Sequence, residues 1–366
     1  MKKKIDKTFF FSFLILIVAG FFIFSSASLG LLAKNESRFT SIAFNQIFFG
    51  LFLGTITCII TTHIPVKFWK KFSLLIFVLT SILALLVFVP GIGWSHGGAT
   101  RWVTILGVHF QPSELLKIGY VFYLAAVLSK YKNKISEFKY GLLPFLILTG
   151  IVALLILTEP DNDTFFMTAL AGFCMYFVSG ARFKHIAILG CIGIVGIITI
   201  VIVRPYVLSR IMTFIHPAQN ALTSGYQIQQ SLIAIGSGGI FGKGFGQSSQ
   251  KFNFLPEPVG DSIFAVASEE FGLIGSVIII LAFVFFALRG LKIASRVNDD
   301  FSRLVVIGIV ILIIVGSFLN IAAMLAIIPL TGTPLIFVSQ GGTALFIAMA
   351  EVGIILSISK LQKKFN

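Results

Sequence analysis

Residues 225–272 read GYQIQQSLIAIGSGGIFGKGFGQSSQKFNFLPEPVGDSIFAVASEEFG. The stretch is rich in glycine and polar side chains, it contains Asp261, Glu269 and Glu270, and long apolar runs lie on both sides of it. A polar segment of this length between apolar runs predicts a loop outside a membrane that leads into a membrane helix. Asp261 is expected at the junction of the two.

The composition excludes an ordinary soluble domain. The chain has 366 residues, of which 57% are hydrophobic and 11% charged, and its mean hydropathy is +1.00. Soluble domains have about 25% charged residues, so we expect a polytopic membrane protein. The net charge of +14 is explained by basic residues that flank membrane spans. No run of interleaved basic and aromatic residues points to nucleic acid as a partner.

The apolar runs predict an all-α fold with about ten transmembrane helices. The first run is longer than the apolar core of a signal peptide, which has about 7–15 residues, so a retained first helix is expected. The expected spans are residues 9–31, 42–62, 72–89, 112–128, 141–157, 164–178, 185–203, 262–288, 304–327 and 335–359. We expect residues 1–366 to form one transmembrane domain with a long loop, about 204–261, between the seventh and eighth helices.

The distribution of Lys and Arg predicts that both termini lie in the cytoplasm. Most of the 28 basic residues fall in the segments that this orientation places inside, as the positive-inside rule requires. The outer segments are then 93–102, 158–163, 204–261 and 328–342. Their Pro and Gly residues predict irregular backbone, which a membrane tolerates only where it is buried in protein or lines a watery cavity. A shared cavity that opens outward is therefore expected.

Within the long outer loop, two shorter stretches have their own signals. Residues 226–235 are expected to form an amphipathic helix on the membrane surface. Residues 236–246 are rich in glycine but lack the strand–turn–helix context of a nucleotide-binding fingerprint, so they are interpreted as a flexible hinge. The three cysteines lie inside apolar runs without metal-ligand spacing, which argues against disulfides and zinc.

Asp261 follows a Leu-Pro-Glu-Pro stretch and Gly260, and it precedes an apolar helix. Aspartate is favoured at helix N-caps, where its charge also suits the helix dipole. Alternatively, it is a carboxylate at the mouth of a cavity that takes a proton from a hydroxyl group. The two roles are compatible.

Glu114 and Lys117 lie three residues apart just after Pro112, which suits the first turn of a helix. This spacing places both side chains on one helix face. Charged residues inside a span face the bundle interior or a cavity. The pair is either an ion pair that locks two helices or a site at which Lys117 holds an anionic lipid headgroup while Glu114 sets its position.

Other charged residues are candidates of a weaker kind. Arg101 and Trp102 follow Gly97 and Gly98, and arginine can grip phosphate oxygens with its planar fork; a simple interfacial anchor is the alternative. Arg204 and Arg210 are further candidates for phosphate contact.

Carboxylates form a second group of candidates. Glu159, Asp161 and Asp163 could bind a divalent cation, although such clusters more often mark a solvated turn. The acids inside predicted spans, Glu269, Glu270 and Glu351, would suit a proton path in a transporter.

A set of motifs spread over essentially the whole chain resembles the SEDS family (shape, elongation, division and sporulation; FtsW/RodA/SpoVE type). The Gln250-Lys251-Phe252 sequence before Leu-Pro-Glu is closer to the FtsW division branch. The motifs are Gly97-Gly98 with Arg101-Trp102, Gln111-Pro112-Ser113-Glu114 with Lys117, Glu159-Pro160-Asp161, Gly225-Tyr226-Gln227 with Gln230-Ser231, Gly236-Ser237-Gly238-Gly239, Leu255-Pro256-Glu257 with Asp261, Glu269-Glu270 with Gly272, and Pro329-Leu330-Thr331-Gly332 with Ser339, Gly341 and Gly342.

The resemblance implies a peptidoglycan glycosyltransferase that polymerises lipid II into glycan strands at the outer face of the cytoplasmic (cell inner) membrane, for septal wall synthesis in cell division. It implies no cofactor, with a divalent cation as an open alternative, and an extracytoplasmic active site. The implied partners are lipid II, a class B penicillin-binding protein that crosslinks the product, other membrane proteins of the divisome or elongasome, and membrane lipid.

The resemblance also implies roles for individual residues. Asp261 would be the essential acid, and Glu114 and Lys117 would line a central cavity. Our hypothesis for the mechanism makes Asp261 the general base for the acceptor hydroxyl. Substrate contacts would fall on Glu114, Lys117, Arg101, Trp102, Gln111, Arg210, Gln227, Gln230, Glu257 and Ser339. The chain departs from the family pattern at Gly260, Ser262, Gln340 and in the 159–163 stretch. A lipid II flippase, an elongation-type (RodA-like) polymerase and a division scaffold with a degenerate site are the alternatives.

Overall fold

The computed structural model describes residues 4–96, 99–105, 108–217 and 224–362. Most of these residues are helical, as the apolar runs predict. The elements in chain order are α1 (Lys7–Lys34), α2 (Glu36–Phe44), η1 (Asn45–Leu53), α3 (Gly54–His63), α4 (Val66–Leu85), η2 (Leu86–Phe88), β1 (Gly93–His96), β2 (Ala99–Ile105), β3 (Val108–Phe110), α5 (Pro112–Lys130), η3 (Lys132–Lys134), η4 (Phe138–Leu142), α6 (Leu143–Thr158), α7 (Asn162–Val178), α8 (Phe183–Val203), α9 (Pro205–Ile215), α10 (Ser224–Ser237), α11 (Gln250–Asn253), α12 (Ile263–Arg296), α13 (Asp300–Met324) and α14 (Gly342–Ser359).

Ten helical segments of the described chain correspond, in order, to the ten expected spans. Eight of them are long and apolar enough to cross a membrane. The second is built from α2, the π-helical segment η1 and α3, which together run from Glu36 to His63. The other two, α5 and α7, are shorter or more charged, but both pack against α13 within the same bundle. The prediction of a polytopic all-α membrane protein is confirmed.

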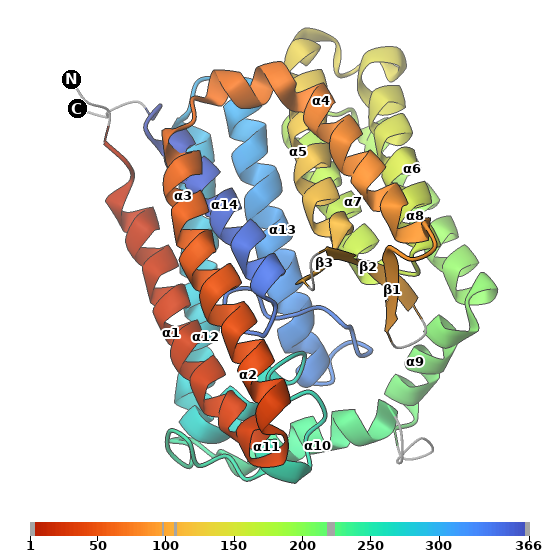
Figure 1. Cartoon of the computed structure of the whole chain (residues 1–366). Coiled ribbons are helices and arrows are strands. Elements are labelled where there is room, and N and C mark those ends of the chain that lie inside the picture. Colours follow the sequence, from red (N-terminus) through yellow and green to blue (C-terminus); the bar gives the residue numbers. More distant parts are fainter. Residues whose placement is uncertain (1–3, 97–98, 106–107, 218–223, 363–366) are drawn as a thin grey trace.

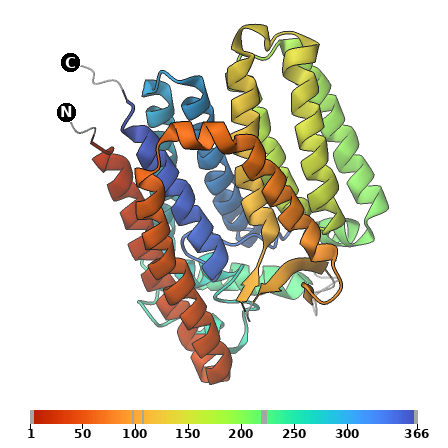
Figure 2. The same cartoon turned by 45° about the horizontal axis from the view of Figure 1, so that its top comes forward.

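Both ends of the chain lie at the same end of the bundle as the connections that follow α3, α5 and α12 (Figures 1 and 2). The strands β1–β3 and the helices α9–α11 lie toward the opposite end. The predicted orientation therefore gathers the unusual motifs at one end of the molecule, away from the basic connections.

A small antiparallel sheet of order β1-β2-β3 is formed by residues 93–96, 99–105 and 108–110, and it begins within the stretch 93–102 that was expected to be an outer loop. Trp94 pairs with Trp102 in the first ladder, and Val103 pairs with Phe110 in the second. The sheet leads directly into α5, so it fixes where the helix that bears Glu114 begins. Gly97 and Gly98, expected to permit a close backbone approach, lie outside the described residues.

The core of the bundle is built around α13 and α14, the most buried of the spans. At the other extreme, α8 has one buried residue, His185, whose ring nitrogen bonds the Tyr176 hydroxyl at 2.7 Å. The all-round apolar sequence of α8 fits this position, because lipid can replace protein as its surroundings. The cysteines are free thiols.

Residues 325–341, between α13 and α14, are irregular and fold back into the bundle. The buried side chain of Gln46, from the second span, donates to the Ser339 carbonyl at 3.1 Å and accepts from the Gly341 N–H at 3.0 Å. Phe337 adopts a φ of 71° within this segment. The expected irregular backbone is therefore present, and the protein satisfies it from within, as the membrane requires.

Candidate functional site

Asp261 lies in the turn directly before α12, as expected, but it does not cap the helix. The N-cap position belongs to Ser262, and no side-chain hydrogen bond caps this helix end within the described chain. The Asp261 side chain is partly exposed. Of the two interpretations of Asp261, the helix cap is therefore wrong, and the carboxylate is left available for another role.

The backbone around Asp261 is held by side chains from the far C-terminal part of the chain. The Asn320 amide donates to the Asp261 carbonyl at 2.8 Å, and the Ser339 hydroxyl donates to the Gly260 carbonyl at 2.8 Å. The Gln340 N–H also donates to the Val259 carbonyl at 2.7 Å. This turn is therefore fixed against α13 and the 325–341 segment before any substrate arrives.

Three charged groups act on the Asp261 carboxylate, one from its own turn and two from other segments. Burial raises the pKa of Asp261 to about 7, the nearby carboxylates of Glu257 and Asp163 add to the rise, and the Arg210 guanidinium opposes it. Arg210, on α9, lies 3.5 Å from the Asp163 carboxylate and donates to the Leu330 carbonyl at 3.2 Å. Glu257 pairs with Arg38 at 3.1 Å. The result is an acid whose pKa is shifted from the usual range of aspartate toward neutral pH.

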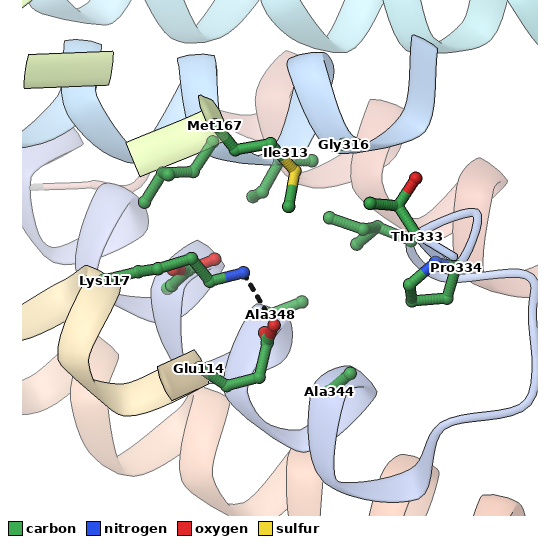
Figure 3. A pocket seen from close by; sticks show the side chains of 12 residues that line it. Glu114, Lys117, Met167, Ile313, Gly316, Thr333, Pro334, Ala344 and Ala348 are labelled. Carbon is green, nitrogen blue, oxygen red and sulfur yellow. Dashed lines mark hydrogen bonds and ion pairs between the residues drawn. The ribbon is translucent and has the colours of Figure 1, made fainter. Parts of the chain in front are cut away.

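Glu114 and Lys117 form an ion pair of 2.8 Å on one face of α5, as their spacing predicts. Both line a small cavity inside the bundle, and Figure 3 shows Lys117 pointing into it toward Glu114. Glu351, from α14, lines the same cavity. The volume is about 30 Å³, which is room for one or two water molecules.

Thr333 connects this cavity to Asp261. It lines the cavity, and its backbone carbonyl accepts a hydrogen bond of 2.9 Å from Asn320. The same Asn320 amide nitrogen donates to the Asp261 carbonyl. One buried side chain therefore bridges the wall of the cavity and the turn that carries the partly exposed acid.

Arg101 and Gln111 contact the turn between α6 and α7 instead of open space. The Arg101 side chain donates to the Glu159 carbonyl at 3.2 Å and to the Pro160 carbonyl, and it lies 3.9 Å from the Asp161 carboxylate. Gln111 donates to Asp161 at 2.8 Å. Much of the hydrogen-bonding capacity of these two side chains is therefore used within the protein.

The carboxylates of the same turn are not a solvated cluster, and the expectation of a solvated turn is wrong. Glu159 and Asp161 are buried, and Asp161 accepts from the Thr164 N–H at the start of α7. Burial and the neighbouring Asp161 raise the pKa of Glu159 to about 8. Among the described residues, no group of three His, Cys, Asp or Glu side chains is arranged to hold a metal ion.

Of the remaining candidate residues, Gln227 and Ser339 contact the turn that carries Asp261. Gln227, on α10, donates to the Ser262 hydroxyl at 3.1 Å. Gln230 lies three residues further along the same helix and is partly buried. Trp102 lies in β2 opposite Trp94, and Arg204 donates to the Leu157 carbonyl. Ser339, being buried and bonded to Gly260, supports the turn from inside.

Two residues of this site were missed by the sequence analysis. Asn320 is a polar residue within a long apolar run, and that position alone could have marked it, because buried polar groups in membrane helices need partners. Asp163 was considered only as part of an acidic cluster. Its pairing with Arg210 and its bond to the Gly332 N–H at 3.2 Å depend on three segments that are distant in sequence.

Comparisons with known proteins agree with this arrangement. The model of the FtsW/RodA/SpoVE family, described as cell cycle proteins, matches residues 6–364. Stage V sporulation protein E of Bacillus subtilis (strain 168) is 35% identical over 352 residues, which are 96% of this chain and 95% of that protein. A probable peptidoglycan glycosyltransferase FtsW of Geobacter sp. (strain M18) is 36% identical over 307 residues, or 84% of each chain.

A chain of the same fold occurs in a solved structure of a peptidoglycan synthase complex, described by the words structural coordination of polymerization and crosslinking. The TM-score is 0.80 at 22% identity, with 99% of both chains covered. From the family match and the identities of its relatives, the chain belongs to the FtsW/RodA/SpoVE family of cell cycle proteins.

Proposed function

We propose that this protein is a peptidoglycan glycosyltransferase that polymerises lipid II into glycan strands during septal wall synthesis. One observation carries the proposal: Asn320 holds the Asp261 turn against the wall of the cavity that contains Glu114 and Lys117. The turn that carries an acid with a pKa of about 7 is thus joined to the wall of a cavity that contains a buried cation, Lys117. The relatives named as probable peptidoglycan glycosyltransferases support the same reaction.

The reaction needs a base for the hydroxyl group of the acceptor sugar. In our proposal the Asp261 carboxylate takes the hydroxyl proton while the oxygen forms a bond to the anomeric carbon of the donor. The bond from that carbon to the diphosphate breaks, and the diphosphate leaves with the electron pair. A base with a pKa of about 7 is well matched to neutral pH, where proton transfer to a positioned side chain contributes about 10²–10⁴-fold.

The leaving diphosphate gains negative charge, which cations near the site would stabilise. Arg210 is the best placed of the outer arginines, because its side chain is 38% exposed and its charge already acts on Asp261. Lys117 is a second cation, inside the cavity. We assign Arg101 a smaller part, since its donors are engaged by backbone carbonyls.

The cavity is far too small for a sugar as it stands, since about 30 Å³ holds one or two waters. We therefore place the sugars at the outer rim beside Asp261, where the acid is partly exposed. Lys117 can reach the diphosphate only if the cavity widens when substrate binds.

We place this site on the extracytoplasmic side of the cytoplasmic membrane. The support is the positive-inside rule, together with the common end shared by both termini and the opposite position of the sheet (Figure 1). A class B penicillin-binding protein is the partner we propose. A chain of this fold occurs in a complex described as coordinating polymerization and crosslinking.

The test is to incubate the purified protein, with and without a class B penicillin-binding protein, with fluorescent lipid II and to separate the products on a gel. We expect glycan strands whose yield rises with the partner. The buried charges Glu114, Lys117 and Glu351 would also suit a flippase. Translocation of lipid II in liposomes without any polymer would contradict the glycosyltransferase and favour that alternative.

A further inference from the structure

Helix α12 is broken at Gly272, in the membrane-embedded part of the chain. Gly272 has φ 66° and ψ −164°, a conformation that is essentially restricted to glycine. A break of this kind leaves carbonyl groups on one side and N–H groups on the other without helical partners. Inside a membrane each unsatisfied group is costly, so something must replace the missing bonds.

The glycine-rich segment 238–246 supplies the replacement. The N–H groups of Lys243 and Gly244 donate to the carbonyls of Glu269 and Glu270, each at 3.0 Å. On the other side of the break, the Leu273 N–H donates to the Gly239 carbonyl at 2.9 Å and the Ile274 N–H to the Ile240 carbonyl at 3.2 Å. Residues 236–246 were expected to be a flexible hinge, but residues 239–244 within them are bonded to α12 on both sides of the break.

The backbone of the glycine-rich segment contacts the backbone of α12 directly at Gly242 and Gly272. A Cβ atom on Gly242 would lie 2.1 Å from the Glu270 carbonyl oxygen, and one on Gly272 would lie 2.3 Å from the Gly242 nitrogen. Side chains at these two positions are therefore excluded by contact as well as by conformation. The glycines of the segment serve close packing here.

The break decides where Asp261 lies. Continued as one straight helix, the 34 residues of α12 would extend about 50 Å at 1.5 Å per residue. On the neighbouring helix, Asp300 and Asn320 are separated by only about 30 Å, yet Asn320 bonds the Asp261 carbonyl. The first part of α12, 263–271, must therefore turn away from the axis of the rest to bring Asp261 to Asn320.

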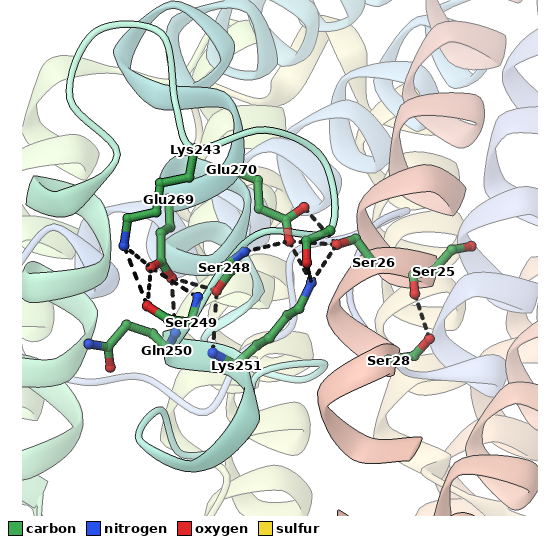
Figure 4. A network of polar contacts seen from close by, with 11 residues as sticks. Ser25, Ser26, Ser28, Lys243, Ser248, Ser249, Gln250, Lys251, Glu269 and Glu270 are labelled. Carbon is green, nitrogen blue, oxygen red and sulfur yellow. Dashed lines mark hydrogen bonds and ion pairs between the residues drawn. The ribbon is translucent and has the colours of Figure 1, made fainter. Parts of the chain in front are cut away.

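Two buried glutamates join the glycine-rich segment to the first part of α12, residues 263–271, which we call the half-helix (Figure 4). The Glu269 carboxylate accepts from Lys243 at 2.6 Å, from the Ser248 hydroxyl, and from the N–H groups of Ser249 at 3.2 Å and Gln250 at 3.3 Å. Its side chain is fully buried. It thus ties the end of the half-helix to the chain that leads into α11.

Glu270 forms the second tie, with Lys251. The two side chains are 2.7 Å apart and almost fully buried, and Lys251 also donates to the Gly246 carbonyl and the Ser26 hydroxyl, each at 2.9 Å. Ser26, from α1, in turn donates to Glu270 at 2.6 Å. Figure 4 shows these side chains pointing toward one another from three segments. Asp261 lies midway in sequence between Lys251 and Glu270. The ion pair therefore joins the two ends of the segment 251–270, which contains Asp261.

We propose that Lys251, Glu270 and Ser26 form a clasp that positions Asp261 for glycosyl transfer, by fixing the direction of the half-helix 263–271. The proposal rests on the proposed function of Asp261, and the residues of the clasp are positioning residues that need not touch the substrate. The glycine-rich segment supplies the backbone hydrogen bonds that α12 lacks at Gly272. The clasp then fixes the angle between the two parts of the helix. A change in the clasp should therefore move the acid without removing it.

The first experiment separates positioning from stability. Lys251→Met and Glu270→Gln each leave a buried partner unpaired and should lower both the melting temperature and the turnover of lipid II. In Lys251→Met/Glu270→Met neither charge of this buried pair remains, and apolar replacement of a buried pair is often neutral for stability. We expect its melting temperature to return to that of the wild type while turnover stays about 10- to 100-fold lower, because small misplacements of catalytic groups have effects of this size.

The matched control is Arg289→Met, which removes an ion pair of 3.1 Å with Asp6 at the other end of α12. It should change the melting temperature and leave turnover unaltered. Wild-type turnover in the Lys251→Met/Glu270→Met protein would overturn the proposal and reduce the clasp to a stabilising contact. Ser26→Ala, a milder change, should reduce turnover with little change in melting temperature, and unaltered turnover there would also count against the clasp.

A second experiment needs no enzymatic activity. The Gln340 N–H donates to the Val259 carbonyl at 2.7 Å, and a Cβ atom on Gly260 would lie 3.3 Å from the end of the Gln340 side chain. Gly260→Cys and Gln340→Cys should therefore be joined by a short bifunctional thiol reagent in a background in which the three native cysteines are serine. The rate of cross-linking should fall severalfold when Lys251→Met/Glu270→Met is added, and an unchanged rate would overturn the proposal. If the wild type makes no polymer, the proposed function fails, and this cross-link still decides whether the clasp sets the position of the turn.

Discussion

The side-chain amide of Asn320 donates one hydrogen bond to the backbone carbonyl of Asp261 at 2.8 Å and another to that of Thr333 at 2.9 Å. This pairing joins the end of α13 to the turn before α12 and to the wall of the internal cavity. Donation to two carbonyls also fixes which end of the amide faces them, because an amide oxygen there would be repelled. Asn320 is therefore the residue through which the two halves of the candidate site are aligned.

Replacing Asn320 by leucine should impair both the fold and the reaction. Leucine is close in size but leaves two buried carbonyls without donors, which costs about 1–3 kcal/mol each. Turnover of lipid II should fall by about 10- to 100-fold through displacement of Asp261. Ser317→Ala, one turn away on α13, removes a hydroxyl that bonds only its own helix. Equal turnover in the two variants would contradict the role of Asn320.

The rate of polymerisation should rise with pH through about 7, the pKa to which burial raises Asp261. A general base acts in its ionised form, so protonation below that pH removes activity and the rate levels off above it. Glu257→Gln removes a negative charge that adds to the rise, so the midpoint should move to lower pH. Arg210→Met should move it to higher pH. The measurement is the initial rate between pH 5.5 and 9 for the wild type and the two variants. If the midpoints of the three pH profiles coincide, a group other than Asp261 titrates.

The buried carboxyl of Glu159 should make the folded protein less stable as pH rises. Its pKa is raised to about 8 by burial and by Asp161, so the folded state holds a proton that the unfolded state releases at lower pH. Stability is then lost as pH increases toward 8. Glu159→Gln, which cannot ionise, should flatten the fall in melting temperature between pH 6 and 9. Parallel melting curves for the variant and the wild type would refute this assignment.

Lys117→Met should lower the catalytic efficiency with lipid II by about 10²-fold, the usual effect of removing one charge-stabilising group. The single change also leaves Glu114 without its 2.8 Å partner, so a loss of fold must be separated from a loss of chemistry. The double variant Glu114→Gln/Lys117→Met restores neutrality and should recover the melting temperature but not the rate. Recovery of both would mean that the pair only locks the helices.

The amino-acid sequence predicts the parts of this site that depend on local periodicity. The order of the spans follows from apolar runs of sufficient length, and the shared face of Glu114 and Lys117 follows from helix geometry alone. An amphipathic helix was likewise expected over residues 226–235, and it lies within α10 (Ser224–Ser237).

What the sequence does not predict depends on contacts between distant segments. Gly272 lies in a run with no other sign of a break, and its conformation is stabilised by a segment about thirty residues earlier. The buried state of Glu159 and Asp161 follows from the packing of a turn that reads as polar. Gln340 and Gly260 both depart from the family pattern, and they are neighbours in the structure. A Cβ atom added to Gly260 would come close to the Gln340 side chain.

The central claim is that Asp261 is the base of a glycosyl transfer, and the rate of strand formation by Asp261→Asn tests it most directly. Asparagine keeps the shape of the side chain and cannot take the proton, so the rate from lipid II should fall by about 10²–10⁴-fold at neutral pH. Glu36→Gln, an exposed acid at the start of α2, should keep the wild-type rate. An Asp261→Asn protein that polymerises lipid II at the wild-type rate would contradict the claim.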